Sequence, residues 1–266
     1  MFVQRLISGI VLLIIMIGSI AIGGNLLLAV MTAISLIGLF ELYRVLSLEK
    51  QIVAFIGYGF TILLNVILYM NCDDTSIIML LLLIMLLYMV IYVLTYPRYK
   101  TNDIALSFFS FFYVSIMLSY IYQVRDLDNG IYLVWLIFIS AWGSDTCAYC
   151  TGMLIGKHKL PNELSPKKSI EGCIGGIVGS ALLGFIYATI FKEQLAMEHV
   201  QWIFAVIGAF GSVLSQIGDL AASAIKRNYQ IKDYGQLIPG HGGILDRFDS
   251  IIFTAPIVFI LLQLLV

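Results

Sequence analysis

Charged residues are scarce in this sequence. Only 12% of its 266 residues are Asp, Glu, Lys or Arg, whereas soluble domains carry about 25%. The formal net charge is −1, which gives no basic surface of the kind that binds nucleic acid. Hydrophobic residues make up 61% of the chain. Because lipid offers the backbone no hydrogen-bond partners, the sequence predicts an all-α, polytopic integral membrane bundle.

Cysteine is too scarce and too scattered for a disulfide framework. The four cysteines are Cys72, Cys147, Cys150 and Cys173, and three of them lie in or beside apolar segments. Cys147 and Cys150 form a CxxC pair, but no second pair of Cys or His stands at ligand spacing, so we do not expect zinc there. Both side chains are predicted to pack between helices.

Apolar runs of about 20 residues, each long enough to cross a hydrocarbon core, recur along the chain. The first run follows Arg5, but it is longer than the apolar region of a signal peptide and lacks a convincing small-residue cleavage site. We therefore interpret it as an uncleaved span. No internal repeat indicates an inverted-repeat transporter. We expect nine transmembrane helices, at about residues 6–22, 26–46, 52–70, 76–96, 104–124, 131–155, 173–191, 200–224 and 251–266.

Basic residues indicate how these spans are oriented. With the N-terminus in the cytoplasm, all but two of the 15 Lys and Arg residues fall in inner connections, and only Arg125 and Lys192 lie outside. Such an excess of positive charge is typical of cytoplasmic loops. Two long inner loops, residues 156–171 and 227–249, hold much of the polar sequence. Any chemistry is therefore expected at the cytoplasmic face.

The polar content also divides the chain. Residues 1–124 hold the first five helices and little polar sequence beyond turns. We interpret them as a scaffold that offers contacts for dimerisation or lipid. Residues 125–266 hold helices six to nine and the two long cytoplasmic loops, and we expect the catalytic residues there.

Two acidic residues, Asp145 and Asp219, lie within the sixth and eighth predicted spans. An intramembrane carboxylate is costly and indicates function by default, although a lysine of the following loop could instead neutralise Asp145. A polar stripe surrounds Asp219 within about 40° on the helical wheel, and it consists of Ser212, Ser215, Ser223 and Lys226. Helix packing by small residues is an alternative account of the serines, and it also suits Gly175, Gly176 and Gly179. It does not account for an aspartate.

Two further aspartates, Asp246 and Asp249, stand three residues apart at the entry to the last span. This spacing puts both on one face of the helix start, and N-capping would explain one of them, Asp249. Together with Asp219 they offer oxygen ligands only, which suit Mg²⁺. No cluster of His and Cys competes for a softer metal.

Basic residues and glycines accompany these carboxylates. Carboxylates that hold a metal, cationic side chains and glycine-rich backbone together are typical of a phosphate-handling site. His241, in GHGG, could donate a hydrogen bond or a proton. The glycines could alternatively form only a turn, and the basic residues could only set topology or bind anionic lipid, as we interpret Lys157 and Lys159. The set comprises Lys167, Lys168, Lys226, Arg227, Lys232, Gly242, Gly243 and Arg247.

The segment 223–249, SAIKRNYQIKDYGQLIPGHGGILDRFD, resembles the signature of phosphatidate cytidylyltransferases (CDP-diacylglycerol synthases). Upstream, SDTCAYCTGMLIGKHKL and LSPKKSIEGCIGG also resemble the family's pattern, whereas the first four spans match it only in hydrophobicity. Cys147 and Cys150 stand where the family commonly has Gly or Ala and an aromatic residue. Every fixed position of the signature is filled, by Ser223, Lys226, Arg227, Lys232, Asp233, Gly235, Pro239, His241, Gly242, Gly243, Asp246, Arg247 and Asp249.

The resemblance implies a Mg²⁺-dependent enzyme, with room for a second cation, that converts CTP and phosphatidic acid to CDP-diacylglycerol and diphosphate. It further implies a homodimer in the cell membrane, the inner or plasma membrane, with its active site facing the cytoplasm. Asp219 and Asp246 would hold the metal, joined by Asp249. The expected catalytic residues are Asp219, Lys226, Arg227, His241, Asp246 and Arg247. The expected phosphate-binding residues are Lys167, Lys168, Ser223, Lys232, Gly242 and Gly243, and further candidates are Asp145, Glu171 and Asp233.

Two other functions compete with this interpretation. A CTP-dependent polyprenol or lipid-alcohol kinase also combines many spans with a carboxylate-rich cytoplasmic site, but it releases CDP instead of diphosphate. A cation transporter could use Asp145 and Asp219 as ligands, but it has no use for the polar loop outside the membrane. The helical motif of CDP-alcohol phosphotransferases is absent from the sequence.

Overall fold

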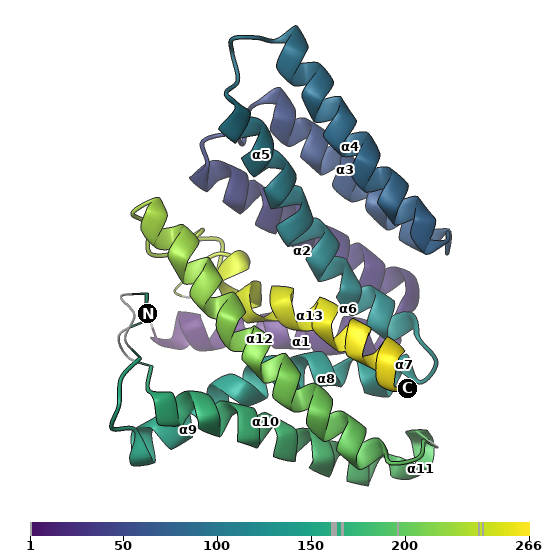
Figure 1. The fold of residues 1–266 in the computed structure, drawn as a ribbon, viewed down its shortest axis with the longest axis vertical. Coiled ribbons are helices and arrows are strands. Elements are labelled where there is room, and N and C mark those ends of the chain that lie inside the picture. The colour runs from purple at the N-terminus through teal and green to yellow at the C-terminus, as the bar shows by residue number, and fades with distance from the viewer. Residues whose placement is uncertain (1, 161–163, 166–167, 196, 239, 241) are drawn as a thin grey trace. The chain divides into compact units, whose positions relative to one another are not determined.

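The computed structural model describes residues 2–160, 164–165, 168–195, 197–238, 240 and 242–266. These residues form helices, and their connections are mostly short except for residues 156–169 and 229–244 (Figure 1). Within the described ranges the only β pairing is two isolated bridges. The prediction of an all-α membrane bundle is confirmed.

The helices follow one another closely along the chain. The first part of the chain forms α1 (Phe2–Ile22), α2 (Gly24–Val45), α3 (Ile52–Tyr69), α4 (Asp74–Leu94), α5 (Thr101–Ser110), the π-helical η1 (Phe111–Ile116) and α6 (Met117–Asp126). The remainder forms α7 (Gly130–Leu133), α8 (Trp135–Phe138), the π-helical η2 (Ile139–Gly143), α9 (Ser144–Ile155), α10 (Ile170–Ile190), α11 (Lys192–Leu195), α12 (Val200–Asn228) and α13 (Leu245–Leu265).

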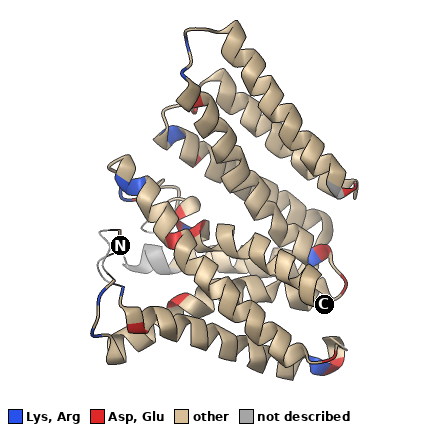
Figure 2. Ribbon diagram, viewed as in Figure 1, with Lys and Arg blue, Asp and Glu red and all other residues tan. Residues whose placement is uncertain are grey.

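Eight helical stretches in the described part of the chain are long and apolar enough to cross a membrane, and a shorter apolar stretch, Ile7–Ile22, precedes them. Charged residues stand mainly at helix ends and in the connections (Figure 2). The count of nine spans and the cytoplasmic N-terminus stay predictions. One boundary was wrong, because α13 begins at Leu245 and not near residue 251.

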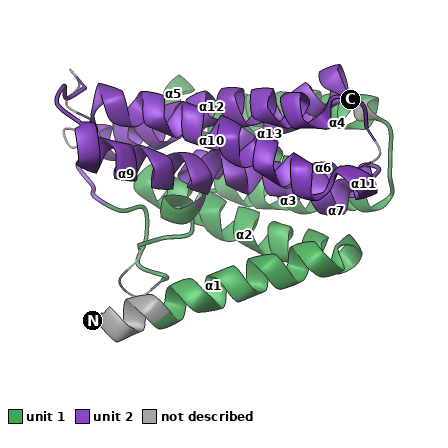
Figure 3. Ribbon diagram, turned by 90° about the horizontal axis from the view of Figure 1, so that it is seen from below, with its two compact units in different colours: residues 1–122, 233–247 green, residues 123–232, 248–266 purple. Residues whose placement is uncertain are grey.

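The helices group into two compact units (Figure 3). Unit 1 comprises residues 1–122 and 233–247, and unit 2 comprises residues 123–232 and 248–266. The loop 233–247 therefore belongs to the same unit as the first helices.

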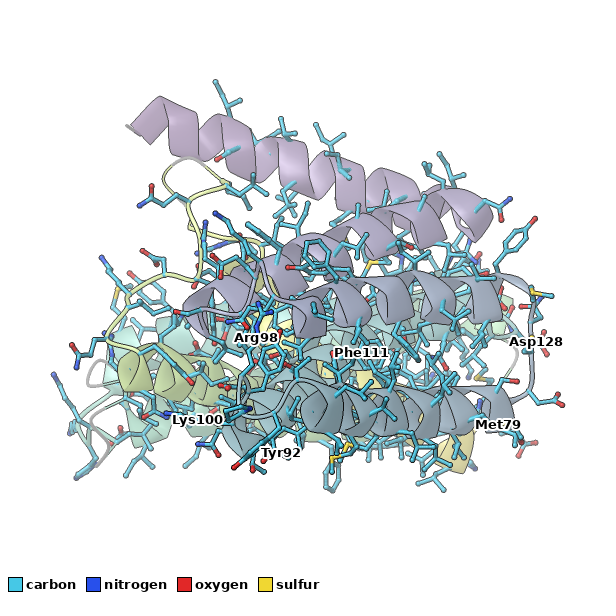
Figure 4. The ribbon with its side chains drawn as sticks, turned by 90° about the horizontal axis from the view of Figure 1, so that it is seen from above. Met79, Tyr92, Arg98, Lys100, Phe111 and Asp128 are labelled. Carbon is cyan, nitrogen blue, oxygen red and sulfur yellow. The ribbon has the colours of Figure 1, made fainter. Side chains whose placement is uncertain are left out.

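Unit 1 is held together by large side chains and buried hydroxyl groups. The Tyr43 hydroxyl of α2 lies 3.2 Å from the Tyr88 hydroxyl of α4 and donates to the carbonyl of Ser107 of α5 at 3.1 Å. The hydroxyls of Thr61 and Ser115 are 2.7 Å apart. Figure 4 shows Tyr92, Arg98 and Lys100 at one end of the α4 and α5 pair, Met79 toward the other, and Phe111 between them. The hydroxyls of Tyr43, Thr61 and Ser115 thus find partners on neighbouring helices, as burial favours.

Unit 2 is built on close contacts of glycine. Helix α10 packs against both α9 and α12 (Figure 1). Gly184 of α10 lies against the backbone carbonyl of Phe204, and Gly208 of α12 lies against that of Ser180, so a methyl group at either position would overlap backbone. Small residues allow helices to approach this closely in membranes.

The packing prediction for the glycines of α10 is confirmed, because Gly175 lies against Thr151, Gly176 against Ser144 and Gly179 against Cys147. The prediction also holds for Cys147. It is wrong for Cys150, which is exposed, because its position on α9 turns it away from these contacts.

Candidate functional site

The residues predicted for the site are divided between the two units. Lys167 and His241 lie outside the described residues. Unit 2 holds Asp145, Lys168, Glu171, Asp219, Ser223, Lys226, Arg227, Lys232 and Asp249. Unit 1 holds Asp233, Gly242, Gly243, Asp246 and Arg247.

An ion pair joins Lys168 and Asp219 in unit 2. The ammonium Nζ of Lys168, just before α10, lies 2.5 Å from Oδ2 of Asp219 on α12. The two side chains are 25% and 29% exposed. A carboxylate within an apolar helix needs such a partner, and Lys168 supplies it.

Two other carboxylates lie within electrostatic range of this pair. Asp145, in the first turn of α9 directly after the π-helical η2, interacts with both Lys168 and Asp219. Asp249 of α13 interacts with Asp219, Asp145 and Lys226. A lysine of the following loop was the alternative partner for Asp145, and Lys168 of that loop forms its close ion pair with Asp219 instead. Three carboxylates and two ammonium groups form this cluster, which we call the carboxylate cluster.

The polar stripe on α12 faces protein. Ser212 and Ser215 are fully buried, and the Ser212 hydroxyl lies 2.7 Å from that of Ser144 on α9. Gln216 donates to the carbonyl of Cys173 on α10 at 3.1 Å. These contacts place this part of the stripe against α9 and α10, inside the protein.

A pocket of about 430 Å³ opens beside the ion pair in unit 2. Asp145, Lys168, Ser169 and Gln216 contribute polar groups to it, and Ala148 and Met153 are among its apolar lining. Apolar walls with a few convergent polar groups are typical of ligand sites.

The fit of this cluster to a metal can be judged from its donors. Asp145, Asp219 and Asp249 offer carboxylate oxygens, which suit Mg²⁺, and the Asp219 carboxylate already holds a cationic group. Among the described side chains, no three of His, Cys, Asp or Glu converge as ready ligands of one ion. The donor chemistry therefore fits Mg²⁺, and Mg²⁺ binding stays a prediction.

In unit 1, Asp246 organises the glycine-rich loop. The residue is 7% exposed, and its Oδ2 accepts hydrogen bonds from the backbone N–H groups of Tyr234, at 2.8 Å, and Gly243, at 2.9 Å. The N–H of Ile238 donates to the carbonyl of Gly242 at 2.9 Å. Gly242 has φ +88°, a conformation that residues with a side chain rarely adopt. The loop is thus a folded turn.

The structure does not support N-capping as the alternative account of Asp249. Since α13 begins at Leu245, Asp249 lies in its second turn, where its Oδ1 accepts from the N–H of Ser250 at 2.8 Å. Asp246 lies in the first turn instead. The two aspartates remain three residues apart on one helix, as neighbours on its surface.

Glu41, which contacts this loop, was not among the site residues predicted from the sequence. Glu41 of α2 is 2% exposed, and its Oε1 and Oε2 accept hydrogen bonds from the N–H groups of Ile244, at 3.0 Å, and Leu245, at 2.9 Å. Only Asp145 and Asp219 were recognised as acids within spans. The available signal was Glu41 itself, a lone acid inside the second apolar run.

The remaining candidates have simpler surroundings. Glu171 accepts from His158 Nδ1 at 2.6 Å, where the His158 side chain is 75% exposed, so it is engaged at the start of α10. Ser169 caps that helix by accepting from the N–H of Gly172 at 3.1 Å. Ser223 and Lys226 are half-buried, and exposed positions are held by Arg227, Lys232, Asp233 and Arg247.

Carboxylates, ammonium groups and glycine-rich backbone within an apolar helical bundle are typical of a membrane-embedded enzyme that handles phosphate groups. The chain matches the family model described as "Cytidylyltransferase family" over residues 3–265, and it belongs to this family. This membership confirms the resemblance inferred from the signature and makes the protein a nucleotidyltransferase.

Curated relatives carry a more specific description. The chain is 33% identical to the phosphatidate cytidylyltransferase of Bacillus subtilis (strain 168) over 270 aligned positions, which cover 98% of this chain and 97% of that protein. It is 38% identical to the phosphatidate cytidylyltransferase of Staphylococcus saprophyticus over 170 positions, covering 64% of this chain and 63% of that protein. The corresponding Staphylococcus aureus (strain COL) protein is 39% identical over 172 positions, with the same coverage. The chain thus spans less than two thirds of these staphylococcal relatives in alignment, and nearly all of the Bacillus protein.

Proposed function

We propose that this chain is a phosphatidate cytidylyltransferase, which transfers the cytidylyl group of CTP to phosphatidic acid. Its family membership and the names of its relatives support this reaction. The observation on the chain itself that carries the proposal is the ion pair of Lys168 and Asp219 with Asp145 and Asp249 around it. Phosphate transfer needs such a concentration of charge where a nucleotide meets a lipid.

The reaction is an in-line displacement at the α-phosphorus of CTP. An oxygen of the phosphatidate phosphate forms the new bond, and the bond to the β-phosphate breaks to release diphosphate. A phosphate monoester has a second pKa of about 6 and is largely dianionic at neutral pH, so no strong general base is required. Catalysis then depends on positioning and on neutralising charge.

The chain's own residues divide these tasks. Lys226, Arg227 and Arg247 offset the negative charge that develops on diphosphate, and Lys168 orients a phosphate group beside the pocket of unit 2. The backbone of the glycine-rich loop approaches phosphate oxygens closely, as glycine permits. Lys167, Ser223 and Lys232 add phosphate contacts, and His241 donates a hydrogen bond.

Asp219 and Asp246, joined by Asp249, would hold Mg²⁺. When bound, the ion supplies charge neutralisation on the triphosphate. Lys168 keeps Asp219 paired within the apolar helix, and the oxygen-only donor set is the support for this metal.

The site faces the cytoplasm of the cell membrane in this proposal. CTP is water-soluble and phosphatidic acid carries its phosphate at the membrane surface, so both substrates meet at an interface. The positive charge of the predicted inner loops supports that side. A homodimer is proposed from the family resemblance alone.

The test is an assay of detergent-purified protein with radiolabelled CTP and phosphatidic acid. CDP-diacylglycerol and diphosphate should form and should disappear with EDTA. A lipid-alcohol kinase would release CDP instead, so the nucleotide product distinguishes the two functions. Asp219→Asn should lower turnover by at least about 10³-fold, because it removes the charge at the centre of the cluster.

The matched control is Asp128→Asn. Asp128 is exposed in the connection between α6 and α7 (Figure 4), so the same chemical change there should leave turnover unaltered. Near-normal turnover of folded Asp219→Asn protein at saturating Mg²⁺ would refute the metal assignment.

A further inference from the structure

Helix α2 of unit 1 carries a buried carboxylate that no step of the proposed reaction uses. Glu41 receives two backbone N–H groups, from Ile244 and Leu245, one on each oxygen. These groups belong to the start of α13, where the first N–H groups of a helix have no partner within the helix. A carboxylate also suits the positive end of a helix dipole. Glu41 therefore acts as an N-terminal cap that comes from another helix.

The loop is shaped around this carboxylate. Gly235 and Gly243 both lie so close to Glu41 that a methyl group on either one would overlap its side chain. Gly243 is also the residue whose N–H donates to Asp246 Oδ2. The same short stretch of backbone thus contacts Glu41 on one side and the proposed metal ligand on the other.

A second anchor comes from the next turn of α2. Arg44 Nη2 donates to the carbonyl of Tyr234 at 2.9 Å, and the N–H of Tyr234 donates to Asp246 Oδ2 at 2.8 Å. Glu41 and Arg44 therefore hold backbone segments on both sides of the loop, and each held segment supplies one of the two N–H groups that orient the Asp246 carboxylate. The fit between α2 and the loop extends to the packing of Gly38 against Leu245.

A role in stability alone would not call for this arrangement. Burying a carboxylate is costly, and well-packed apolar residues are often at least as stabilising. What a carboxylate adds is a fixed position for two N–H donors, and hydrogen bonds to a charged group are stronger and more directional than neutral ones. The residues whose position is fixed are those next to Asp246.

We propose that Glu41 is a positioning residue for cytidylyl transfer, with Arg44 as its second anchor. Glu41 holds the backbone at Gly243, Ile244 and Leu245, so that the Asp246 carboxylate and the glycine-rich loop keep the geometry that catalysis needs. This inference rests on the proposed function, because it assigns its role through Asp246. Glu41 itself touches no substrate.

The test compares Glu41→Gln with Glu49→Gln in the full-length, detergent-purified protein. Glutamine presents one acceptor and one donor group, so one backbone N–H would face another donor, and the loop would shift. Glu49 belongs to the same unit, in the connection between α2 and α3, and makes no contact with the loop among the described interactions. We expect Glu41→Gln to lower kcat on the order of 10²-fold, the effect of a small misplacement of reacting groups, with much smaller changes in KM. Glu49→Gln should leave kcat within about twofold.

Hydrogen exchange of the same proteins separates positioning from general stability. In Glu41→Gln, the amides of residues 233–247 should exchange faster while those of α3 and α4 stay as in the unaltered protein. Arg44→Met, at an exposed position, provides a milder variant should Glu41→Gln fold poorly. It removes one anchor, so kcat should fall about tenfold with faster exchange around Tyr234.

Two results would overturn the inference: an unaltered kcat in both Glu41→Gln and Arg44→Met, or a lowered kcat that comes with faster exchange throughout unit 1. Failure of the proposed function looks different, because the unaltered protein would then make no CDP-diacylglycerol. In that case the exchange data alone would still show whether Glu41 holds the loop.

Discussion

The two units each enclose a carboxylate within a helix, and they satisfy it by opposite means. Asp219 in unit 2 pairs with an ammonium group, and its side chain is 29% exposed. Glu41 in unit 1 is 2% exposed and pairs with two backbone N–H groups. A lysine side chain can move away from its partner through rotamer changes, whereas backbone cannot move without changing the fold. The partner of Asp219 is therefore exchangeable, whereas the partners of Glu41 fix the backbone around it.

The helices of the two units are also packed differently. Unit 1 joins its helices through tyrosine, threonine and serine hydroxyls, as at Tyr43 and Tyr88. Unit 2 brings the backbones of α10 and α12 into contact at Gly184 and Gly208. Direct backbone contact leaves little tolerance for added volume, so unit 2 holds its carboxylate cluster on a closely packed support.

Among the variants that test this comparison, the largest effect is expected from removing the charge of Lys168, the exchangeable partner of Asp219. Lys168→Met keeps the unbranched side chain and removes the charge, so it should lower kcat/KM for CTP on the order of 10²-fold, through lost phosphate orientation. The Mg²⁺ concentration for half-maximal rate should not rise, because Asp219 no longer has a competing cation. Steady-state kinetics at varied Mg²⁺ measure both quantities.

Lys157→Met is the matched control for this variant. Lys157 is exposed just after α9, where we assign it to membrane topology, so its loss should alter kcat/KM less than about twofold. A Lys168→Met protein with unaltered kcat/KM would remove Lys168 from the reaction and leave it only as the counter-ion of Asp219.

The sequence could predict much of unit 2, because its signals are local. Apolar length predicts the helices, and the polar stripe around Asp219 follows from helical periodicity. The spacing of small residues is enough to predict that helices pack at Gly175, Gly176 and Gly179. The choice between Asp145 and Asp219 as the close partner of Lys168 could not be predicted, since it depends on how α9, α10 and α12 pack.

The role of Glu41 could not be predicted from the sequence, because its hydrogen-bond partners are far away along the chain. Ile244 lies 203 residues further along the chain, and no local pattern predicts such a pairing. The start of α13 was misplaced for the same reason. Hydropathy detects only the apolar part of a helix, and here the first turn is polar and is stabilised by Glu41 and Asp246 instead of by a local cap. Whether the side chain of Cys150 is exposed likewise depends on how α9 is rotated about its axis.

A smaller loss of activity is expected from a methyl group added to the loop beside Glu41. Gly235→Ala places a methyl group against Glu41 in the folded loop, and overpacking of this kind costs about 1–3 kcal/mol. We expect kcat to fall about tenfold, with the change in hydrogen exchange confined to residues 233–247. The double variant Gly235→Ala with Glu41→Ala should lose less activity than the two single effects combined, because the smaller side chain at position 41 leaves space for the methyl group. Strict additivity of the two effects would contradict direct contact between these residues.

The smallest effect tests the difference in packing and needs no assay of activity. Gly184→Ala should lower the free energy of unfolding by about 1–3 kcal/mol, because its methyl group would meet the carbonyl of Phe204 on a closely packed helix. Gly59→Ala on α3 of unit 1 is the control, since a methyl group there has no atom within 4 Å. It should raise the free energy of unfolding by about 0.5–1 kcal/mol, because alanine loses less backbone entropy than glycine in a helix. Thermal unfolding in detergent measures both changes, and a Gly184→Ala protein as stable as Gly59→Ala would show that α10 and α12 can separate at no cost.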